Sequence, residues 1–273
     1  MAYILTPHLQ TFLCLAMRRM KSGHGASLLL TGLPGGGKTS FAKEFARKLG
    51  VPLHYYSGTP DKERDLLYEI DVQGVLDKKS AWVPGPAWTS FQESRLDGAV
   101  LLIDEIDKTH QGFDAFLLRL LEDGVFRAPD GSEITADKRK LAVILTSNGR
   151  RPLRPELLRR CQRIEVPLPE GELLFKITDQ IAGKGLPRNL ISLLCRMSKD
   201  IGKVDAEQQP SPKEIALCCL DLLELKDLQQ ANQEETIEMV VASWFVKGGG
   251  VELMGKALPY KWKRAISTEI GLC

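Results

Sequence analysis

A glycine-rich segment near the N-terminus has the residue types and spacing of a phosphate-binding loop. Residues 32–39 (GLPGGGKT) fit the pattern GxxxxGK[ST] at every fixed position. Glycines let backbone N–H groups close around phosphate oxygens, and the N-terminus of the following helix adds its positive dipole end. We expect Lys38 to contact the β- and γ-phosphates and the Thr39 hydroxyl to bind Mg²⁺. The predicted nucleotide-binding residues of the loop are Gly32, Pro34, Gly35, Gly36, Gly37, Lys38, Thr39 and Ser40.

Two carboxylates, Asp104 and Glu105, directly follow the apolar run 99–103 (AVLLI) and are called the acidic pair below. Asp104 is expected to hold Mg²⁺ through the water shell of the ion, and Glu105 to polarise the water that attacks the γ-phosphate. A further apolar run, 141–146, is followed by Asn148, whose amide would orient that water. Asp107 receives no role beyond that of an acid at a helix N-terminus.

The segment 150–163 is rich in arginine and contains a single acid, Glu156. Two interpretations remain open: a contact with nucleic acid, or an arginine that reaches the nucleotide of a neighbouring subunit and neutralises transition-state charge. The segment holds no aromatic residue, so the base stacking expected of single-strand binding is missing and the second interpretation is favoured. The arginines are Arg150, Arg151, Arg154, Arg159, Arg160 and Arg163.

Apolar runs alternate with helical periods along the first two thirds of the chain, which predicts an α/β fold with a parallel sheet covered on both faces. Residues 39–49 have helical spacing, and Pro129-Asp130-Gly131 predicts a hairpin over 126–134. Residues 67–88 are rich in Gly, Pro and Trp, which indicates an insertion instead of a plain helix. The predicted strands are 26–31, 52–56, 99–103, 141–146 and 163–166.

Apolar runs that predict strands are absent after Pro169, and an all-helical domain is expected to begin near residue 168. Pro212 is placed in the first turn of one of its helices, with Ser211 as the N-cap. The tail from residue 248 onward receives no role. The predicted helices are 172–181, 188–199, 212–228 and 234–246.

The composition is that of an ordinary globular chain. The 273 residues carry a formal net charge of +2, which gives no general signal for polyanion binding. The apolar stretches are too short to span a bilayer, and the N-terminus lacks the pattern of a secretion signal. The six cysteines show no CxxC spacing, which favours small apolar residues in a reducing compartment. We therefore expect a soluble, cytoplasmic protein without membrane contact.

Taken in order, these motifs resemble those of an AAA+ ATPase, and most closely the MoxR-like group of the helix-2-insert clade. Besides the phosphate loop, the acidic pair and Asn148, the resemblance rests on residues 155–160 (PELLRR) and 211–213 (SPK). The segment 82–86 (WVPGP) is similar to the one that follows the helix-2 insert, and 122–126 (EDGVF) resembles the element before the sensor strand. The resemblance covers about residues 1–247.

The resemblance implies a P-loop NTPase core followed by a small helical lid. The AAA+ domain would span residues 1–168, with the helix-2 insert at about 67–88 and a hairpin before the sensor strand at about 124–137. The lid would span 169–247, and the tail 248–273 has no implied role.

The resemblance also implies roles for single residues: Asn148 as sensor 1, Arg160 as the arginine finger and Lys213 as sensor 2. Three departures matter here, of which one is Asp107-Lys108, which stands where many relatives carry Asn-Arg and leaves Asp107 without an implied role. The sequence reads Arg159-Arg160-Cys161 where the group often has Asp-Arg-Phe, so Arg159 is the alternative finger. Lys213 stands where arginine is usual, and a point charge there gives weaker geometric control than a planar guanidinium.

In function, the resemblance implies a homo-oligomeric ring, usually hexameric, that hydrolyses ATP with Mg²⁺ and remodels a protein partner, often one with a von Willebrand factor type A domain.

The alternative is a nucleic-acid-associated motor or loader with the same core, in which residues 150–163 or 18–21 contact phosphates. The near-neutral net charge of the chain disfavours this alternative. A scaffold that scarcely hydrolyses ATP is a third interpretation, against which the intact Lys38, Asp104 and Glu105 argue.

Overall fold

The computed structural model describes residues 4–60, 63–71, 76, 81–183, 185–227, 233–246 and 260–271. The chain divides into two compact units. An α/β unit comprises Ala2–Gly32 and Gly37–Val166, and a helical unit comprises Pro167–Cys273 together with Leu33–Gly36 of the phosphate loop.

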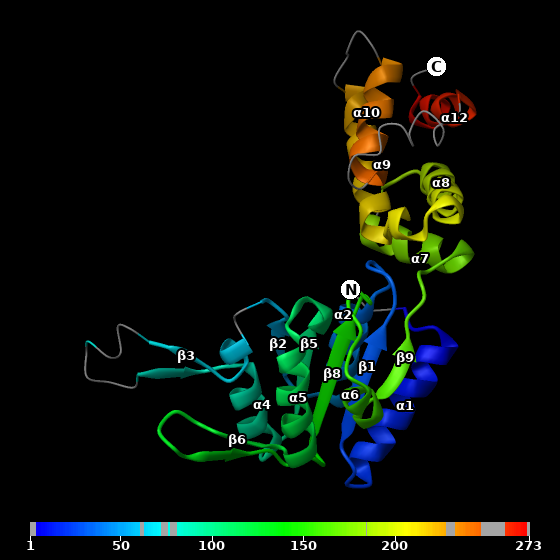
Figure 1. The fold of residues 1–273 in the computed structure, drawn as a ribbon. Helices are drawn as coiled ribbons and strands as arrows, with labels where there is room; N and C mark the ends of the chain where they lie inside the picture. Colours follow the sequence, from blue (N-terminus) through cyan, green and yellow to red (C-terminus); the bar gives the residue numbers. More distant parts are fainter. Residues whose placement is uncertain are drawn as a thin grey trace. The chain divides into compact units, whose positions relative to one another are not determined.

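A five-stranded parallel sheet forms the centre of the α/β unit (Figure 1). Its strands are β1 (Ala26–Thr31), β2 (Leu53–Ser57), β5 (Ala99–Asp104), β8 (Leu141–Ser147) and β9 (Gln162–Glu165). They lie in the order β2-β5-β8-β1-β9, so β8 separates β1 from β5. Every strand predicted from the apolar runs is present within one or two residues, and the parallel arrangement is confirmed.

Helices cover both faces of this sheet. Leu28 and Leu30 of β1 point to the face packed by α1 (Pro7–Lys21) and α2 (Lys38–Leu49). Leu29, which lies between them, points to the face packed by α4 (Pro86–Ser94), α5 (Gln111–Asp123) and α6 (Pro155–Arg160). Because successive strand residues face opposite sides, fully apolar strands are required here, and this explains why the runs lack a polar alternation.

Two antiparallel hairpins extend the α/β unit, and α4 contacts both (Figure 1). Within the segment predicted as an insertion, β3 (Tyr68–Ile70) pairs with β4 (Trp82–Pro84), after the short helix η1 (Glu63–Leu66). The predicted hairpin around the Pro-Asp-Gly turn is confirmed: β6 (Val125–Arg127) pairs with β7 (Glu133–Thr135). Part of residues 67–88 lies outside the described ranges.

The described residues of the helical unit form the four predicted helices and one that the sequence did not predict. These are α7 (Gly171–Ala182), α8 (Arg188–Val204), α9 (Pro212–Asp227), α10 (Gln233–Phe245) and, in the tail, α12 (Tyr260–Ile270), with the short η3 (Ala206–Gln208) before α9. Ile266 and Ile270 of α12 are buried in the same apolar core as the other helices. At the start of α9, Ser211 and Glu214 exchange reciprocal hydrogen bonds, so the predicted cap is a capping box.

The cysteines of the described ranges are free thiols. Cys14 is exposed, whereas burial raises the pKa of Cys161 to about 12 and that of Cys195 to about 11. Among the described residues, no helix combines the length and the apolar character that crossing a membrane requires.

Candidate active site

The phosphate loop leaves the carboxyl end of β1 and leads into α2. Gly32 has a φ of +138°, and a Cβ there would lie 2.3 Å from the Val166 carbonyl oxygen, so only glycine fits at the start of the loop. Lys38 is 6% exposed and its Nζ donates a hydrogen bond to the Gly32 carbonyl at 2.7 Å. Burial lowers the pKa of Lys38, and the carboxylate of Asp104 is the largest opposing influence. A buried ammonium at a helix N-terminus fits an anionic phosphate chain.

Oxygen ligands suited to Mg²⁺ meet where β5 ends. The Thr39 hydroxyl donates to the Asp104 carboxylate at 3.0 Å, although the two residues are far apart in the sequence. Asp104 is only 8% exposed, and the Tyr55 hydroxyl donates to it at 3.3 Å. A hydroxyl and a carboxylate side by side are hard oxygen donors of the type that Mg²⁺ prefers, so Thr39 and Asp104 fit this ion.

The carboxylate of Glu105 lies at the same edge of the sheet and contacts the predicted sensor residue. Asn148 Nδ2 donates to Glu105 Oε1 at 3.2 Å, and Lys108 Nζ donates to Oε2 at 2.5 Å. The Glu105 side chain is 29% exposed, so water reaches it. The structure therefore brings Asn148 and the acidic pair together, because β8 and β5 are neighbouring parallel strands whose carboxyl ends meet.

Two buried residues that the sequence did not assign to the site hold this arrangement. Thr146 donates its hydroxyl proton to Asp104 Oδ1 at 2.5 Å and accepts the backbone N–H of Glu105 at 2.8 Å. Asp107 accepts the backbone N–H groups of Asn148 at 3.1 Å and of Arg150 at 3.0 Å. Thr146 could have been noticed in the sequence because it is a polar residue within an otherwise apolar strand. Nothing in the sequence around Asp107 indicates that it supports the loop after β8.

The arginine-rich segment is not a uniform basic surface. Arg151 makes a bidentate ion pair with the fully buried Asp114 of α5 and also donates to the carbonyl oxygens of Ile106 and Thr109. Arg160 of α6 pairs with Glu122 of α5 in the same chain. Arg151 is therefore a structural residue, which removes one cation from the nucleic-acid interpretation.

The predicted finger and sensor 2 residues are exposed on the helices that carry them. Arg159 is exposed, and the Arg160 side chain is 55% exposed. Lys213 is exposed in the first turn of α9, in the helical unit. Within the described part of the α/β unit, neither Arg159 nor Arg160 makes a hydrogen bond with the acidic pair. The roles of both arginines and of Lys213 stay predictions.

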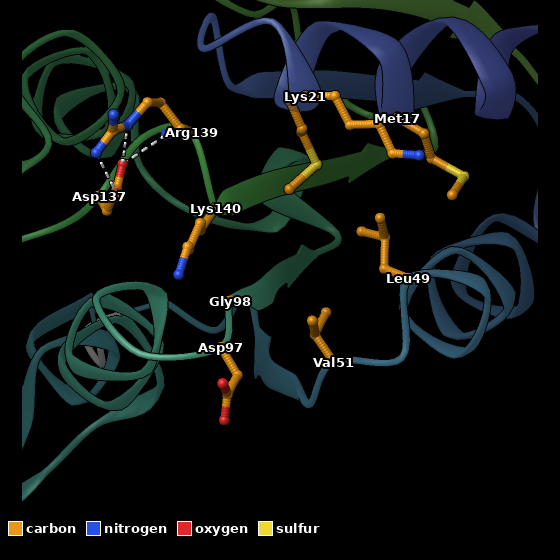
Figure 2. Close-up of a pocket in the computed structure, with 10 residues that line it drawn as sticks. Met17, Lys21, Leu49, Val51, Asp97, Gly98, Asp137, Arg139 and Lys140 are labelled. Atoms are coloured by element: carbon orange, nitrogen blue, oxygen red, sulfur yellow. Dashed lines mark hydrogen bonds and ion pairs between the residues drawn. The ribbon is translucent and has the colours of Figure 1, made fainter.

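A separate surface pocket of about 460 Å³ lies at the opposite edge of the sheet (Figure 2). Asp97 and Gly98 directly precede β5 and Lys140 directly precedes β8, whereas the acidic pair and Asn148 follow the far ends of these strands. Figure 2 shows Arg139 and Asp137 paired at its rim. None of the predicted nucleotide-site residues lines this pocket.

The sheet topology, the phosphate loop and the acidic pair together define a P-loop nucleotide-binding domain of the α/β class. Residues 27–161 match the family model of the AAA domain (dynein-related subfamily). The chain therefore carries an AAA+ domain, of an ATPase family, and the fold expected from the sequence is confirmed.

Curated relatives include chaperones and proteases. The chain is 31% identical over 150 residues to the chaperone protein ClpB 2 of Parasynechococcus marenigrum, covering 49% of this chain and 15% of that protein. It is 29% identical over 134 residues to the chloroplastic chaperone protein ClpC4 of Oryza sativa subsp. japonica, covering 45% and 14%. It is 31% identical over 170 residues to the peroxisomal Lon protease homolog 2 of Zea mays, covering 58% and 18%. The chain thus spans less than a fifth of the length of these relatives.

Proposed function

We propose that this protein hydrolyses ATP to ADP and phosphate with Mg²⁺. The observation that carries the proposal is the meeting of three predicted groups at one sheet edge: Lys38 in the phosphate loop, the Thr39–Asp104 contact, and the Asn148–Glu105 contact. Thr39 and Asp104 would hold Mg²⁺, which when bound neutralises charge on the phosphate oxygens.

Glu105 is the base in this proposal. Its carboxylate is accessible to water, and hydrogen bonds from Asn148 and Lys108 fix both of its oxygens. A carboxylate fixed in this way accepts a proton from an attacking water at a defined position. Asn148, as the sensor 1 residue, would orient the same water through its amide.

The finer proposal is a MoxR-type ring, hexameric in its usual form, that remodels or activates a protein partner. It is supported by Arg160, which is solvent-accessible on α6 and has no contact with the acidic pair of its own chain within the described structure. In this proposal the arginine acts in trans and reaches the nucleotide of a neighbouring subunit across an interface. In this proposal Lys213 of the helical lid contacts the γ-phosphate, and the protein partner has a von Willebrand factor type A domain.

The similarity to the ClpB and ClpC chaperones supports a protein partner over a nucleic acid. The internal ion pair of Arg151 points the same way, because it reduces the charge that the arginine-rich segment offers to phosphates. A nucleic-acid motor or loader is the alternative that an assay must separate.

ATP turnover, measured by phosphate release, tests the proposal. The wild type, Lys38→Ala and Glu105→Gln are compared without additions, with single-stranded DNA, with RNA, and with a purified von Willebrand factor type A domain. We expect Mg²⁺-dependent turnover by the wild type alone among the three. Stimulation by the protein domain supports remodelling, and stimulation by nucleic acid instead would favour the alternative. Absence of turnover by the wild type in every mixture would refute ATP hydrolysis.

A further inference from the structure

Glu105 has an unusual backbone conformation. Its φ of +55° and ψ of +48° are left-handed, and it is the one non-glycine residue in the described ranges with a positive φ. Side chains disfavour this region, so a residue remains there when the surrounding structure enforces it. The direction in which the Glu105 carboxylate leaves the chain depends on this enforced turn.

Three hydrogen bonds to backbone groups of the acidic pair enforce the turn. The N–H of Glu105 donates to the Thr146 hydroxyl at 2.8 Å, and its carbonyl accepts the N–H of Lys108 at 2.9 Å. From the other side, the N–H of Gly58, just after β2, donates to the Asp104 carbonyl at 2.7 Å. The end of β2 therefore packs directly against the peptide that joins the acidic pair.

Gly58 lies too close to the backbone of the acidic pair for a side chain to fit. A Cβ at this position would lie 2.5 Å from the Glu105 carbonyl oxygen and 3.0 Å from the Asp104 carbonyl oxygen. Both obstacles are backbone atoms, which cannot rotate away as a side chain does. Gly58 is buried and does not itself have a positive φ, so the lack of space, and not its own backbone conformation, requires glycine here.

We propose that Gly58 is a positioning residue for ATP hydrolysis, because its missing side chain lets β2 support the left-handed turn that aims the Glu105 carboxylate. This inference rests on the proposed role of Glu105 as the base. An added Cβ displaces the turn or withdraws the end of the edge strand β2 that supports it, and not β5, because β5 is buried on both faces and paired with strands on both sides. Restoring ordinary contact requires a shift of about 1 Å, a displacement that costs a positioned catalytic group about 100-fold in rate.

Gly58→Ala is the test, and Gly112→Ala is its matched control. Gly112 lies in the first turn of α5, also lacks a positive φ, and a Cβ there meets nothing within 4 Å. For Gly58→Ala we expect kcat to fall about 100-fold while KM and the affinity for ATP stay within about threefold of the wild type. Gly112→Ala should keep wild-type values of all three.

A combined variant separates positioning from a general structural role. If Gly58 acts through the Glu105 carboxylate, Gly58→Ala should not further lower the residual kcat of Glu105→Gln. Retained turnover in Gly58→Ala would overturn the proposal. A parallel loss of ATP affinity would also overturn it, because it would assign Gly58 to the fold of the whole site and not to the direction of the Glu105 carboxylate. Failure of the proposed function is distinguishable from failure of this inference. If Glu105 is not the base, the Glu105→Gln single variant, which keeps Gly58, will show full turnover.

Discussion

Arg151→Ala should be among the most destabilising single changes in the α/β unit. Among the described residues, the substitution leaves the fully buried Asp114 with the backbone N–H of Arg154 as its one hydrogen-bond donor. It also removes the guanidinium contacts to the carbonyl oxygens of Ile106 and Thr109. Leaving a buried charge without its partner costs about 3–5 kcal/mol. That is a large share of the roughly 5–15 kcal/mol that stabilises an ordinary domain.

Hydrogen exchange of the β8 amides measures this loss, because it reports on the α/β unit without the helical unit. Arg159→Ala is the control, since it removes an exposed arginine from the same segment and should change stability by about 0.5 kcal/mol or less. The double variant Arg151→Ala with Asp114→Ala should lose less than the sum of the single variants, because the stranded charge is gone. If Arg151→Ala and Arg159→Ala differ by less than about 1 kcal/mol, Arg151 is not the buried support described above.

Three further outcomes follow from the site and the cysteines. Arg160→Ala should lower turnover about 10³-fold and Arg159→Ala far less, whereas mixing Arg160→Ala with Lys38→Ala subunits should restore activity at shared interfaces. A larger loss of turnover in Arg159→Ala than in Arg160→Ala would move the finger to Arg159. Thr146→Val should lower the free energy of unfolding by about 1.5–3 kcal/mol in urea, since it removes a hydrogen bond to a buried carboxylate; an unchanged midpoint would contradict this. Among the cysteines of the described ranges, iodoacetamide at neutral pH should alkylate the exposed Cys14 first, because burial raises the pKa of the other thiols; equal rates would contradict their burial.

The sheet could be predicted from the sequence because its physical cause is local. A strand buried on both faces must be apolar throughout, so runs such as 99–103 and 141–146 stand out without any knowledge of their neighbours. The phosphate loop and the acidic pair are equally local signals. Helix α12 was missed because its preceding segment is rich in glycine, and because its stability comes from packing of Ile266 and Ile270 into a distant core.

The supports of the site could not be predicted, because each acts between segments far apart in the chain. Asp107 binds backbone N–H groups of a loop that follows β8, and the backbone of Asp104 and Glu105 leaves no room for a side chain at Gly58. Sequence spacing records neither contact. The same holds for Arg151, whose neighbours in the sequence suggest a basic surface although its own side chain is paired with a buried acid.

Binding and turnover of ATP by Glu105→Gln test the central proposal most directly. The substitution keeps the shape of the side chain and its hydrogen bond to Asn148 while it removes the proton acceptor. We predict an ATP affinity within about threefold of the wild type and a turnover at least about 100-fold lower, with intact ATP retained on the protein. Wild-type turnover in this variant, or a loss of ATP affinity equal to that of Lys38→Ala, would contradict the assignment of Glu105 as the base.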